Sequence, residues 1–220
     1  YNIMALTFTN KAADEMKERI EKICPQVGNL MIGTFHSCFL KILQREYDKI
    51  GFEKNFTIYD TSDSKTLLKH IVADLNFDPK IYEPKLLLSK ISFLKSRLIT
   101  PENYLTSEYY INDKTRLPAF DKVFFEYVKS CHKNNVMDFD DILLNTFILF
   151  RDNQEILKKY QDRFQYIFID EFQDTNVLQN EIIKMLVKKS LKLCVVGDDA
   201  QSIYAFRGAV LANVLNFKSQ

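Results

Sequence analysis

An apolar run that passes directly into two acids is the feature that most constrains the fold of this chain. Tyr166 to Ile169 are all apolar or aromatic, and Asp170 and Glu171 follow at once. A short apolar run of this kind is typical of a strand buried inside a parallel sheet. Ligands of open α/β sheets bind at the carboxyl ends of strands. The two acids are therefore placed to meet a ligand, and one interpretation is a hydrated Mg²⁺ ion with phosphates.

Helix capping is the other interpretation of the same stretch. Asp174 and Asn176 precede a helix with periodic apolar residues, and both residue types favour helix N-termini. Capping accounts for Asp174 or Asn176, but it does not require Asp170 and Glu171 side by side after an apolar strand. The local pattern alone leaves both interpretations open.

Composition indicates a globular chain rich in helix. Its 220 residues are 46% hydrophobic and 27% charged, with only five Gly and five Pro, which excludes a disordered chain. The formal net charge of +1 neither favours nor excludes a nucleic-acid partner. The four cysteines form no CxxC pair, and with three scattered histidines they form no zinc pattern, which indicates reduced thiols in a cytoplasmic protein. No apolar stretch approaches the roughly 20 residues needed to span a bilayer, so we expect no membrane partner.

Strand and helix patterns alternate at both ends of the chain but not in its middle. The predicted strands are residues 2–8, 30–34, 164–170 and 191–196. The predicted helices beside them are residues 11–23, 35–50, 138–150, 154–160, 176–188 and a last one from about 209. Three more helical patterns fill residues 60–135, with a loop over 99–116 and no convincing strand. Thr9, Ser62 and Asp138 are the expected caps.

This alternation predicts the domain organisation. A parallel α/β domain is expected from residues 1–58 and 136–220, interrupted by an all-helical subdomain at 59–135.

Polar clusters lie at or just beyond the ends of the predicted strands. They are Thr7–Ala13, Gly33–Ser37, Asp170–Asn176 and Gly197–Ala209. Because the carboxyl ends of parallel strands meet at one edge of a sheet, we expect the clusters to form a single extended site.

In this order the four clusters resemble motifs Ia, Ib, II and III of the UvrD/Rep/PcrA family of superfamily 1 DNA helicases. Residues Met137 to Ile142 are similar to the family's signature where the chain re-enters the first motor domain. The resemblance covers essentially all 220 residues. It implies a RecA-like parallel sheet of the P-loop NTPase type with a helical insertion. The implied activity is ATP-driven 3′→5′ movement on single-stranded DNA with unwinding of duplex.

The resemblance also implies roles at the nucleotide site, with ATP and Mg²⁺ as cofactors. Asp170 corresponds to the acid that holds Mg²⁺, usually through water. Glu171 corresponds to the residue that activates the attacking water. Gln201 corresponds to the glutamine that senses the γ-phosphate, and Arg207 to the arginine that links the nucleotide and DNA sites. A surface salt bridge stays the alternative for Arg207.

On the DNA side, the resemblance implies base stacking and phosphate contacts. Phe8, Tyr204 and Phe206 match positions that stack on bases, although relatives often carry Trp in place of Phe206. The short polar groups expected to contact phosphates are Thr9, Asn10, Thr34, His36 and Ser37. For His36 a helix cap or a buried histidine is the alternative, and for Phe35 we expect core packing.

One family motif is missing. No Gly-x-x-x-x-Gly-Lys-[Ser/Thr] loop, which would cradle phosphates, occurs in the 220 residues. In the family this loop lies just upstream of motif Ia, and a second motor domain follows motif III. The resemblance therefore implies a piece of a longer helicase. Its expected partners are the rest of that chain, single-stranded DNA and duplex/single-strand junctions.

We expect the piece alone neither to hydrolyse ATP nor to unwind DNA. Three alternatives stay open, namely a single-stranded DNA-binding module without a motor, a non-catalytic subunit that kept the fold, and the motor segment of a helicase–nuclease.

Overall fold

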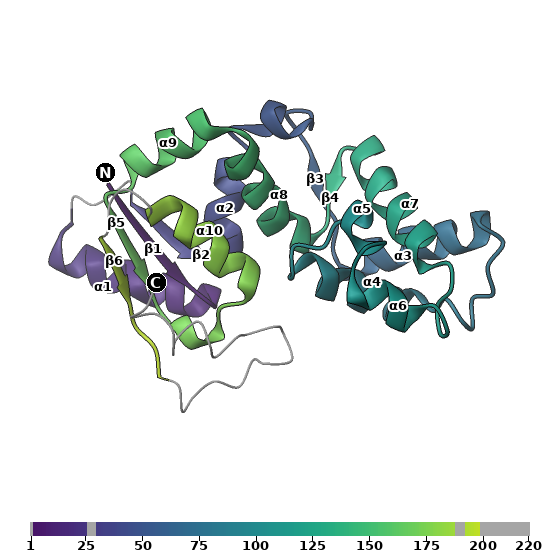
Figure 1. The fold of residues 1–220 in the computed structure, drawn as a ribbon. Coiled ribbons are helices and arrows are strands. Elements are labelled where there is room, and N and C mark those ends of the chain that lie inside the picture. The colour runs from purple at the N-terminus through teal and green to yellow at the C-terminus, as the bar shows by residue number, and fades with distance from the viewer. Residues whose placement is uncertain (1, 26–29, 188–191, 199–220) are drawn as a thin grey trace. The chain divides into compact units, whose positions relative to one another are not determined.

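The computed structural model describes residues 2–25, 30–187 and 192–198 (Figure 1). The contacts divide the chain into two units. Unit 1 consists of Tyr1–Ile50 and Asn145–Gln220, and unit 2 of Gly51–Leu144. Helix α8 (Phe139–Asp152) begins in unit 2 and ends in unit 1.

The described part of unit 1 contains a parallel sheet of four strands. They are β1 (Ile3–Thr7), β2 (Met31–Thr34), β5 (Tyr166–Ile169) and β6 (Leu193–Val195), in the order β2-β1-β5-β6. Leu6 pairs with Gly33 on one side and with Ile169 on the other. Ile169 in turn pairs with Val195. The strands therefore end at one common edge, and the predicted parallel α/β sheet is confirmed.

Helices cover both faces of this sheet. They are α1 (Asn10–Ile23), α2 (Phe35–Leu43), α9 (Gln154–Arg163) and α10 (Val177–Val187), with 3₁₀ turns at Tyr47–Ile50 (η1) and Phe172–Asp174 (η2). Met4, Leu6 and Ile167 are fully buried on the face that α2 and α10 cover (Figure 1). On the α1 side, Tyr166 and Phe168 keep 43% and 41% of their surface exposed. The side chains on one face of β5 therefore belong to the core, and those on the other face are partly exposed to solvent.

The second predicted helix is shorter than its apolar pattern suggests. We predicted it over residues 35–50, but α2 stops at Leu43 and the 3₁₀ turn η1 follows. Glu46 lies between the two and is buried, and its Oε1 accepts hydrogen bonds from Lys159 Nζ at 2.6 Å and Tyr160 OH at 2.8 Å. The helix therefore ends where a buried carboxylate meets partners from a distant part of the chain.

Unit 2 is mainly helical. Its elements are β3 (Thr57–Ile58), α3 (Thr61–Asp74), α4 (Pro84–Lys95), α5 (Pro101–Tyr104), α6 (Glu108–Asp113), α7 (Phe120–Lys133) and β4 (Val136–Met137). Strands β3 and β4 pair in parallel with each other and form a separate two-stranded sheet. The core joins α3, α4 and α7 through Leu68, Leu87 and Phe124, which have no exposed surface. Besides residues 59–135, unit 2 includes the paired strands and the first residues of α8.

Two local predictions in unit 2 were wrong. Residues 99–116 were predicted as a loop, but they contain α5 and α6. Thr100 caps α5 ahead of Pro101, and the buried Tyr104 donates to Asp113 Oδ2 at 2.6 Å. Lys90 of α4 donates to the other oxygen of Asp113, also at 2.6 Å, so the polar segment is held by one cap and by a carboxylate that bonds a distant lysine. Asp60, rather than the predicted Ser62, caps α3 through a reciprocal capping box with Asp63.

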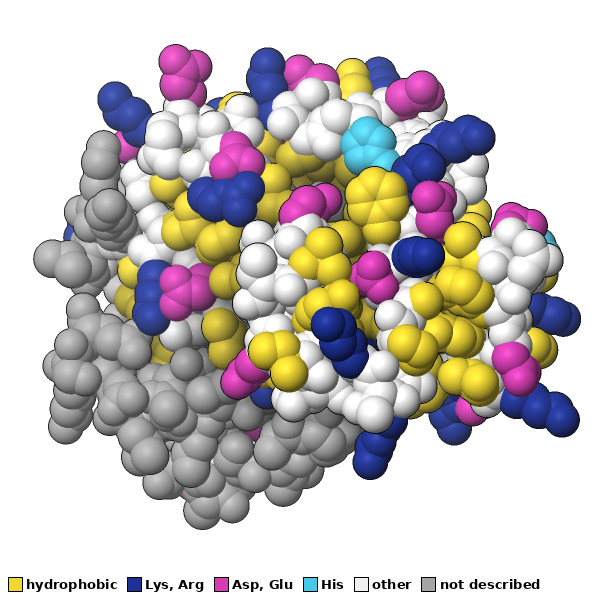
Figure 2. All heavy atoms as spheres, turned by 45° about the vertical axis from the view of Figure 1, so that its right-hand side comes forward, with side chains coloured by type: hydrophobic (Ala, Val, Ile, Leu, Met, Phe, Trp, Pro, Cys, Tyr) yellow, Lys and Arg dark blue, Asp and Glu magenta, His cyan; other side chains and the backbone are white. Residues whose placement is uncertain are grey.

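The surface of the molecule mixes both signs of charge in the view that Figure 2 gives. Basic and acidic side chains are interspersed over this face, with apolar side chains between them. The described residues on this face form no extended basic area of the kind that attracts nucleic acid. In the described ranges, no helix is both long and apolar enough to cross a bilayer.

A buried ion cluster joins three helices of unit 2. Lys95 on α4 is 1% exposed, and its Nζ lies 2.6 Å from Asp138 Oδ2 and 2.7 Å from Asp141 Oδ1. Tyr127 on α7 also donates to Asp138 Oδ2, at 2.9 Å. The backbone N–H groups of Asp138 and Asp141 each donate to the other's carboxylate, so Asp138 caps α8 as predicted. One lysine thus fixes the first turn of α8 against α4 and α7.

The charges of this cluster are strongly interdependent. Burial alone would lower the pKa of Lys95, but attraction to Asp138 and Asp141 raises it overall. Burial would likewise raise the pKa of Asp138, but the nearby Lys95 ammonium lowers it. Burial and the charge of Asp138 together raise the pKa of Asp141 to about 7. Lys95 therefore stays charged and holds Asp138 as a carboxylate.

We predict that Lys95→Met destabilises the chain by about 3–5 kcal/mol, because it leaves two buried carboxylates without their cation. Urea denaturation followed by circular dichroism measures this loss. The matched control is Lys129→Met on α7, where an exposed pair with Glu126 is removed and the cost should stay below about 1 kcal/mol. Equal losses in the two variants would contradict a special role for the buried cluster.

Candidate functional site

Asp170 and Glu171 occupy the sharp turn at the end of β5. The N–H of Asp170 donates to the carbonyl of Leu6 at 2.9 Å, so the pairing with β1 continues to the first acid. Glu171 then adopts a left-handed backbone conformation, with φ 54° and ψ 42°. A residue with a side chain pays roughly 1–2 kcal/mol for this conformation. Such strain is typical of functional sites. It turns the chain away from the strand directly after Asp170.

Asp174 does not cap helix α10. Asn176 does so instead, because its Oδ1 accepts from the N–H of Gln179 at 2.8 Å while Gln179 Oε1 accepts from the N–H of Asn176 at 2.9 Å. Asp174 is 6% exposed, and within the described residues its Oδ1 has no hydrogen-bond partner. Burial and then the charge of Glu171 raise the pKa of Asp174. Of the two capping candidates, only Asn176 fills that role.

Two helices begin at the same edge of the sheet. Thr7 pairs with Thr34 in the register of β1 and β2, so α1 and α2 start side by side. Thr9 caps α1 by accepting from the N–H of Ala12 at 3.2 Å. Thr34 caps α2 by accepting from the N–H of Ser37 at 3.2 Å, and Ser37 Oγ donates to the Thr34 carbonyl at 3.0 Å. Paired helix N-termini favour an anionic ligand at this edge.

The aromatic residues of this edge differ in their exposure. Phe35 is buried, which confirms the expected core packing, and it packs on Phe39. Phe8 is half-buried and meets the ring of Phe35 edge-on, with centroids 6.3 Å apart. Asn10, in the first turn of α1, is exposed. Phe8 and Asn10 therefore keep surface that a ligand can reach.

His36 lies in the first turn of α2 and is half-buried. Burial lowers its pKa from 6.5 to about 4. The ring is therefore neutral at pH 7 and can act there only as a neutral hydrogen-bond donor or acceptor. His36 is not the cap of α2, because Thr34 fills that position.

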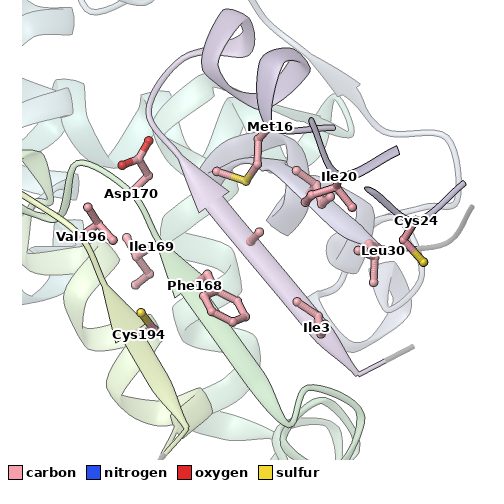
Figure 3. A pocket seen from close by; sticks show the side chains of 12 residues that line it. Ile3, Met16, Ile20, Cys24, Leu30, Phe168, Ile169, Asp170, Cys194 and Val196 are labelled. Carbon is pink, nitrogen blue, oxygen red and sulfur yellow. The ribbon is translucent and has the colours of Figure 1, made fainter. Parts of the chain in front are cut away.

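An apolar hollow of about 720 Å³ lies on the α1 side of the sheet (Figure 3). Met16 and Ile20 of α1 face Ile3 and Phe168 of the strands across it. Asp170 stands at one end of the hollow, and the other described lining residues carry no charge. The hollow suits apolar side chains rather than phosphates, so the charged chemistry belongs to the edge where Asp170 and Glu171 lie.

The donor set at this edge fits Mg²⁺ bound together with phosphates. Within residues 2–25, 30–187 and 192–198, no group of three His, Cys, Asp or Glu is arranged to hold a metal ion. Mg²⁺ with a nucleotide needs no such group, because it keeps several waters and uses one or two carboxylates plus substrate phosphates. The partly exposed carboxylate of Asp170 meets that requirement.

The sequence-predicted site residues fall into two sets. The structure brings the ends of β1, β2 and β5 together, and with them Phe8, Thr9, Asn10, Thr34, His36, Ser37, Asp170 and Glu171. Gln201, Tyr204, Phe206 and Arg207 lie outside the described residues, as does the predicted helix from about 209. Sequence reasoning missed Gln173, whose Nε2 donates to Glu171 Oε2 at 2.6 Å. Its position two residues after Glu171 was the only available signal.

Comparison with known proteins agrees with this geometry. The sequence model of the UvrD/REP helicase N-terminal domain matches residues 1–220. The chain belongs to this family. It is similar to the ATP-dependent DNA helicase PcrA of Bacillus subtilis (strain 168), with 43% identity over 221 residues. It is also similar to PcrA of Staphylococcus aureus (strain Mu50) and of Staphylococcus epidermidis (strain RP62A), with 42% and 43% identity.

These similarities cover 99% of this chain but only 29–30% of each relative. The chain therefore spans about three tenths of the length of the PcrA helicases it matches. Membership of the UvrD/REP family rests on the whole chain, while the activity of a whole helicase is a separate question.

We predict that His36 makes the folded chain less stable as the pH falls. Between pH 6.5 and about 4 the unfolded chain binds a proton on this ring that the folded chain excludes. Its contribution is therefore present above pH 6.5 and is lost on acidification, by at most about 3 kcal/mol at 1.36 kcal/mol per pKa unit.

Urea denaturation from pH 7 to pH 4 measures this effect, with His36→Gln as the comparison because its side chain does not titrate. The variant should lose less stability on acidification than the original chain. Parallel curves for the two proteins would contradict the prediction.

Proposed function

We propose that this chain is part of the first motor domain of an ATP-dependent DNA helicase that moves 3′→5′ on single-stranded DNA. The main support for this proposal is the common edge of the sheet, where Asp170, Glu171 and the N-termini of α1 and α2 meet. The UvrD/REP family match and the PcrA relatives support the same proposal. Unit 1 is then the RecA-like domain, and unit 2 corresponds to the helical insertion predicted at 59–135.

At the nucleotide site, the two acids of β5 have different tasks. Asp170 stays in line with its strand and offers its carboxylate to Mg²⁺, which when bound would neutralise charge on the phosphates of ATP. Glu171 leaves the strand through its left-handed turn. Its carboxylate is available to orient a water and accept its proton. Gln201 and Arg207 are proposed to sense the γ-phosphate and to connect it with DNA.

On the DNA side, the edge offers one aromatic surface and several short polar groups. The half-buried ring of Phe8 is proposed to contact a base, while Thr9, Asn10, Thr34, His36 and Ser37 contact phosphates. Tyr204 and Phe206 are proposed to extend the same stacking surface. The proposed substrates are then single-stranded DNA and duplex/single-strand junctions. The proposed location is the cytoplasm.

We predict that Glu171→Gln in the full-length protein lowers the rate of ATP turnover by about 10²–10⁴-fold, because the amide cannot take a proton from water. Binding of a fluorescent nucleotide should persist. Glu155→Gln, which alters an exposed glutamate of α9, is the matched control and should leave turnover unchanged. Comparable turnover in the original protein and the Glu171 variant would refute the assigned role.

The same assay on the 220-residue chain tests its own competence. We expect no Mg²⁺-dependent hydrolysis, since its sequence has no Gly-x-x-x-x-Gly-Lys-[Ser/Thr] loop. Hydrolysis by this chain that Glu171→Gln abolishes would overturn that expectation.

A second candidate is a DNA-binding module without a motor, which the half-buried ring of Phe8 and the exposed Asn10 favour. We predict that a labelled single strand binds the chain with an affinity that falls steeply as salt rises. Phe8→Ala should weaken binding by about 5- to 100-fold, in the range of one lost base stack. Phe125→Ala, which removes an exposed ring on α7, is the control. An equal effect of both changes would exclude specific stacking at Phe8.

A further inference from the structure

Gln173 uses both ends of its amide in hydrogen bonds at the candidate site. Its side chain is 1% exposed, and it lies in the 3₁₀ turn η2 that follows Glu171. Its Nε2 donates to Glu171 Oε2 at 2.6 Å, and its Oε1 accepts from the N–H of Asp198 at 3.0 Å. One buried amide therefore joins the carboxylate of Glu171 to the segment that follows β6.

The orientation of this amide is fixed by its two partners. The carboxylate of Glu171 can only accept, so it requires the NH₂ end of Gln173. The N–H of Asp198 can only donate, so it requires the oxygen end. A flipped amide would place acceptor against acceptor at Glu171 and donor against donor at Asp198. Gln satisfies both partners, whereas an ionised Glu or a Met at this position cannot.

The backbone of Gly197 packs closely against Gln173. A Cβ atom on Gly197 would lie 2.5 Å from Gln173 Oε1 and 3.3 Å from the backbone nitrogen atoms of Gln173 and Phe172. The N–H of Val196 donates to Ile169 at 2.8 Å, and that of Phe172 donates to the Val196 carbonyl at 2.9 Å. The turn after β5 and the segment after β6 are therefore in direct backbone contact around the amide.

Glu171 needs such a restraint. Its backbone is left-handed and its side chain is half-buried at the edge of the sheet. Several rotatable bonds separate its carboxylate from the backbone. A general base acts only from a position within hydrogen-bond reach of the proton it removes. A misplacement of about 1 Å can cost 100-fold in rate.

From this geometry we infer that Gln173 is a positioning residue for hydrolysis, which holds the Glu171 carboxylate in place and ties it to the backbone N–H of Asp198. The inference rests on the proposed role of Glu171. Gln173 itself touches neither water nor nucleotide in this role. It acts on the rate of the chemical step and not on the binding of ATP.

Gln173→Glu in the full-length protein tests this inference. The substitution keeps an acceptor for Asp198 and nearly the same shape, but it removes the donor to Glu171. We expect the maximal ATPase rate to fall by about 10- to 100-fold. The KM for ATP and the affinity for a fluorescent nucleotide should stay within about twofold.

The pH dependence gives a readout that a purely structural role would not move. The introduced carboxyl can donate to Glu171 only when it carries a proton, and Asp170 and Asp174 are the other acids of the same turn. The activity of the variant relative to the original protein should therefore rise as the pH is lowered from 8 toward 6. Gln173→Met, which has no donor at any pH, should show no such recovery.

Gln179→Glu is the matched control, because it makes the same change at a buried glutamine of α10 whose Oε1 accepts from Asn176. Thermal melting of all variants shows whether they fold. The inference would be overturned if folded Gln173→Glu kept ATPase activity within twofold of the original protein. It would also be overturned if ATPase activity and nucleotide affinity fell together and the fall did not depend on pH. If Glu171→Gln itself stays active, the proposed function fails instead.

Discussion

Parallel pairing of β1 between β2 and β5 is the constraint on which the candidate site depends. It brings the ends of three strands to one edge, although β5 lies more than 130 residues after β2 in the sequence. The register is fixed by burial, because a slip of one residue would turn Met4 and Leu6 out of the core. With the register fixed, the capped starts of α1 and α2 and the carboxylate of Asp170 have no freedom to separate. The chemistry of the edge thus depends on apolar residues that never contact a ligand.

The buried Lys95 cluster has a comparable role within unit 2. A buried ion pair seldom adds stability over well-packed apolar residues, since the cost of desolvation offsets the attraction. Its value lies in specificity, because one ammonium group must meet two carboxylates while the Tyr127 hydroxyl donates to one of them, Asp138. That requirement sets where α8 begins relative to α4 and α7. Asp138 and Asp141 are both helix caps and ion-pair partners, so the start of the helix and the packing of the unit are fixed by the same atoms.

Much of this architecture could be predicted from the sequence, because it depends on local patterns. The strands around Leu6, Ile32 and Ile169 follow from short apolar runs, and the starts of α1 and α8 follow from Thr9 and Asp138. Two of the errors lie where distant partners contribute, and the third, the cap of α3, was a local choice between Asp60 and Ser62. Glu46, just after α2, bonds Lys159 and Tyr160, and Asp113 in the polar segment bonds Lys90 of α4. Gln173 was missed for the same reason, since its second partner, Asp198, is 25 residues away.

The left-handed conformation of Glu171 has a consequence for protein engineering. Gly or Asn would adopt this backbone with roughly 1 kcal/mol less strain than Glu, but either would leave the buried Nε2 donor of Gln173 without its acceptor. A design that considers only backbone strain would therefore replace the residue proposed to activate water. At this position the backbone conformation and the proposed activity make opposite demands on the side chain. Any stabilised version of the domain should accordingly be selected with Glu171 held constant.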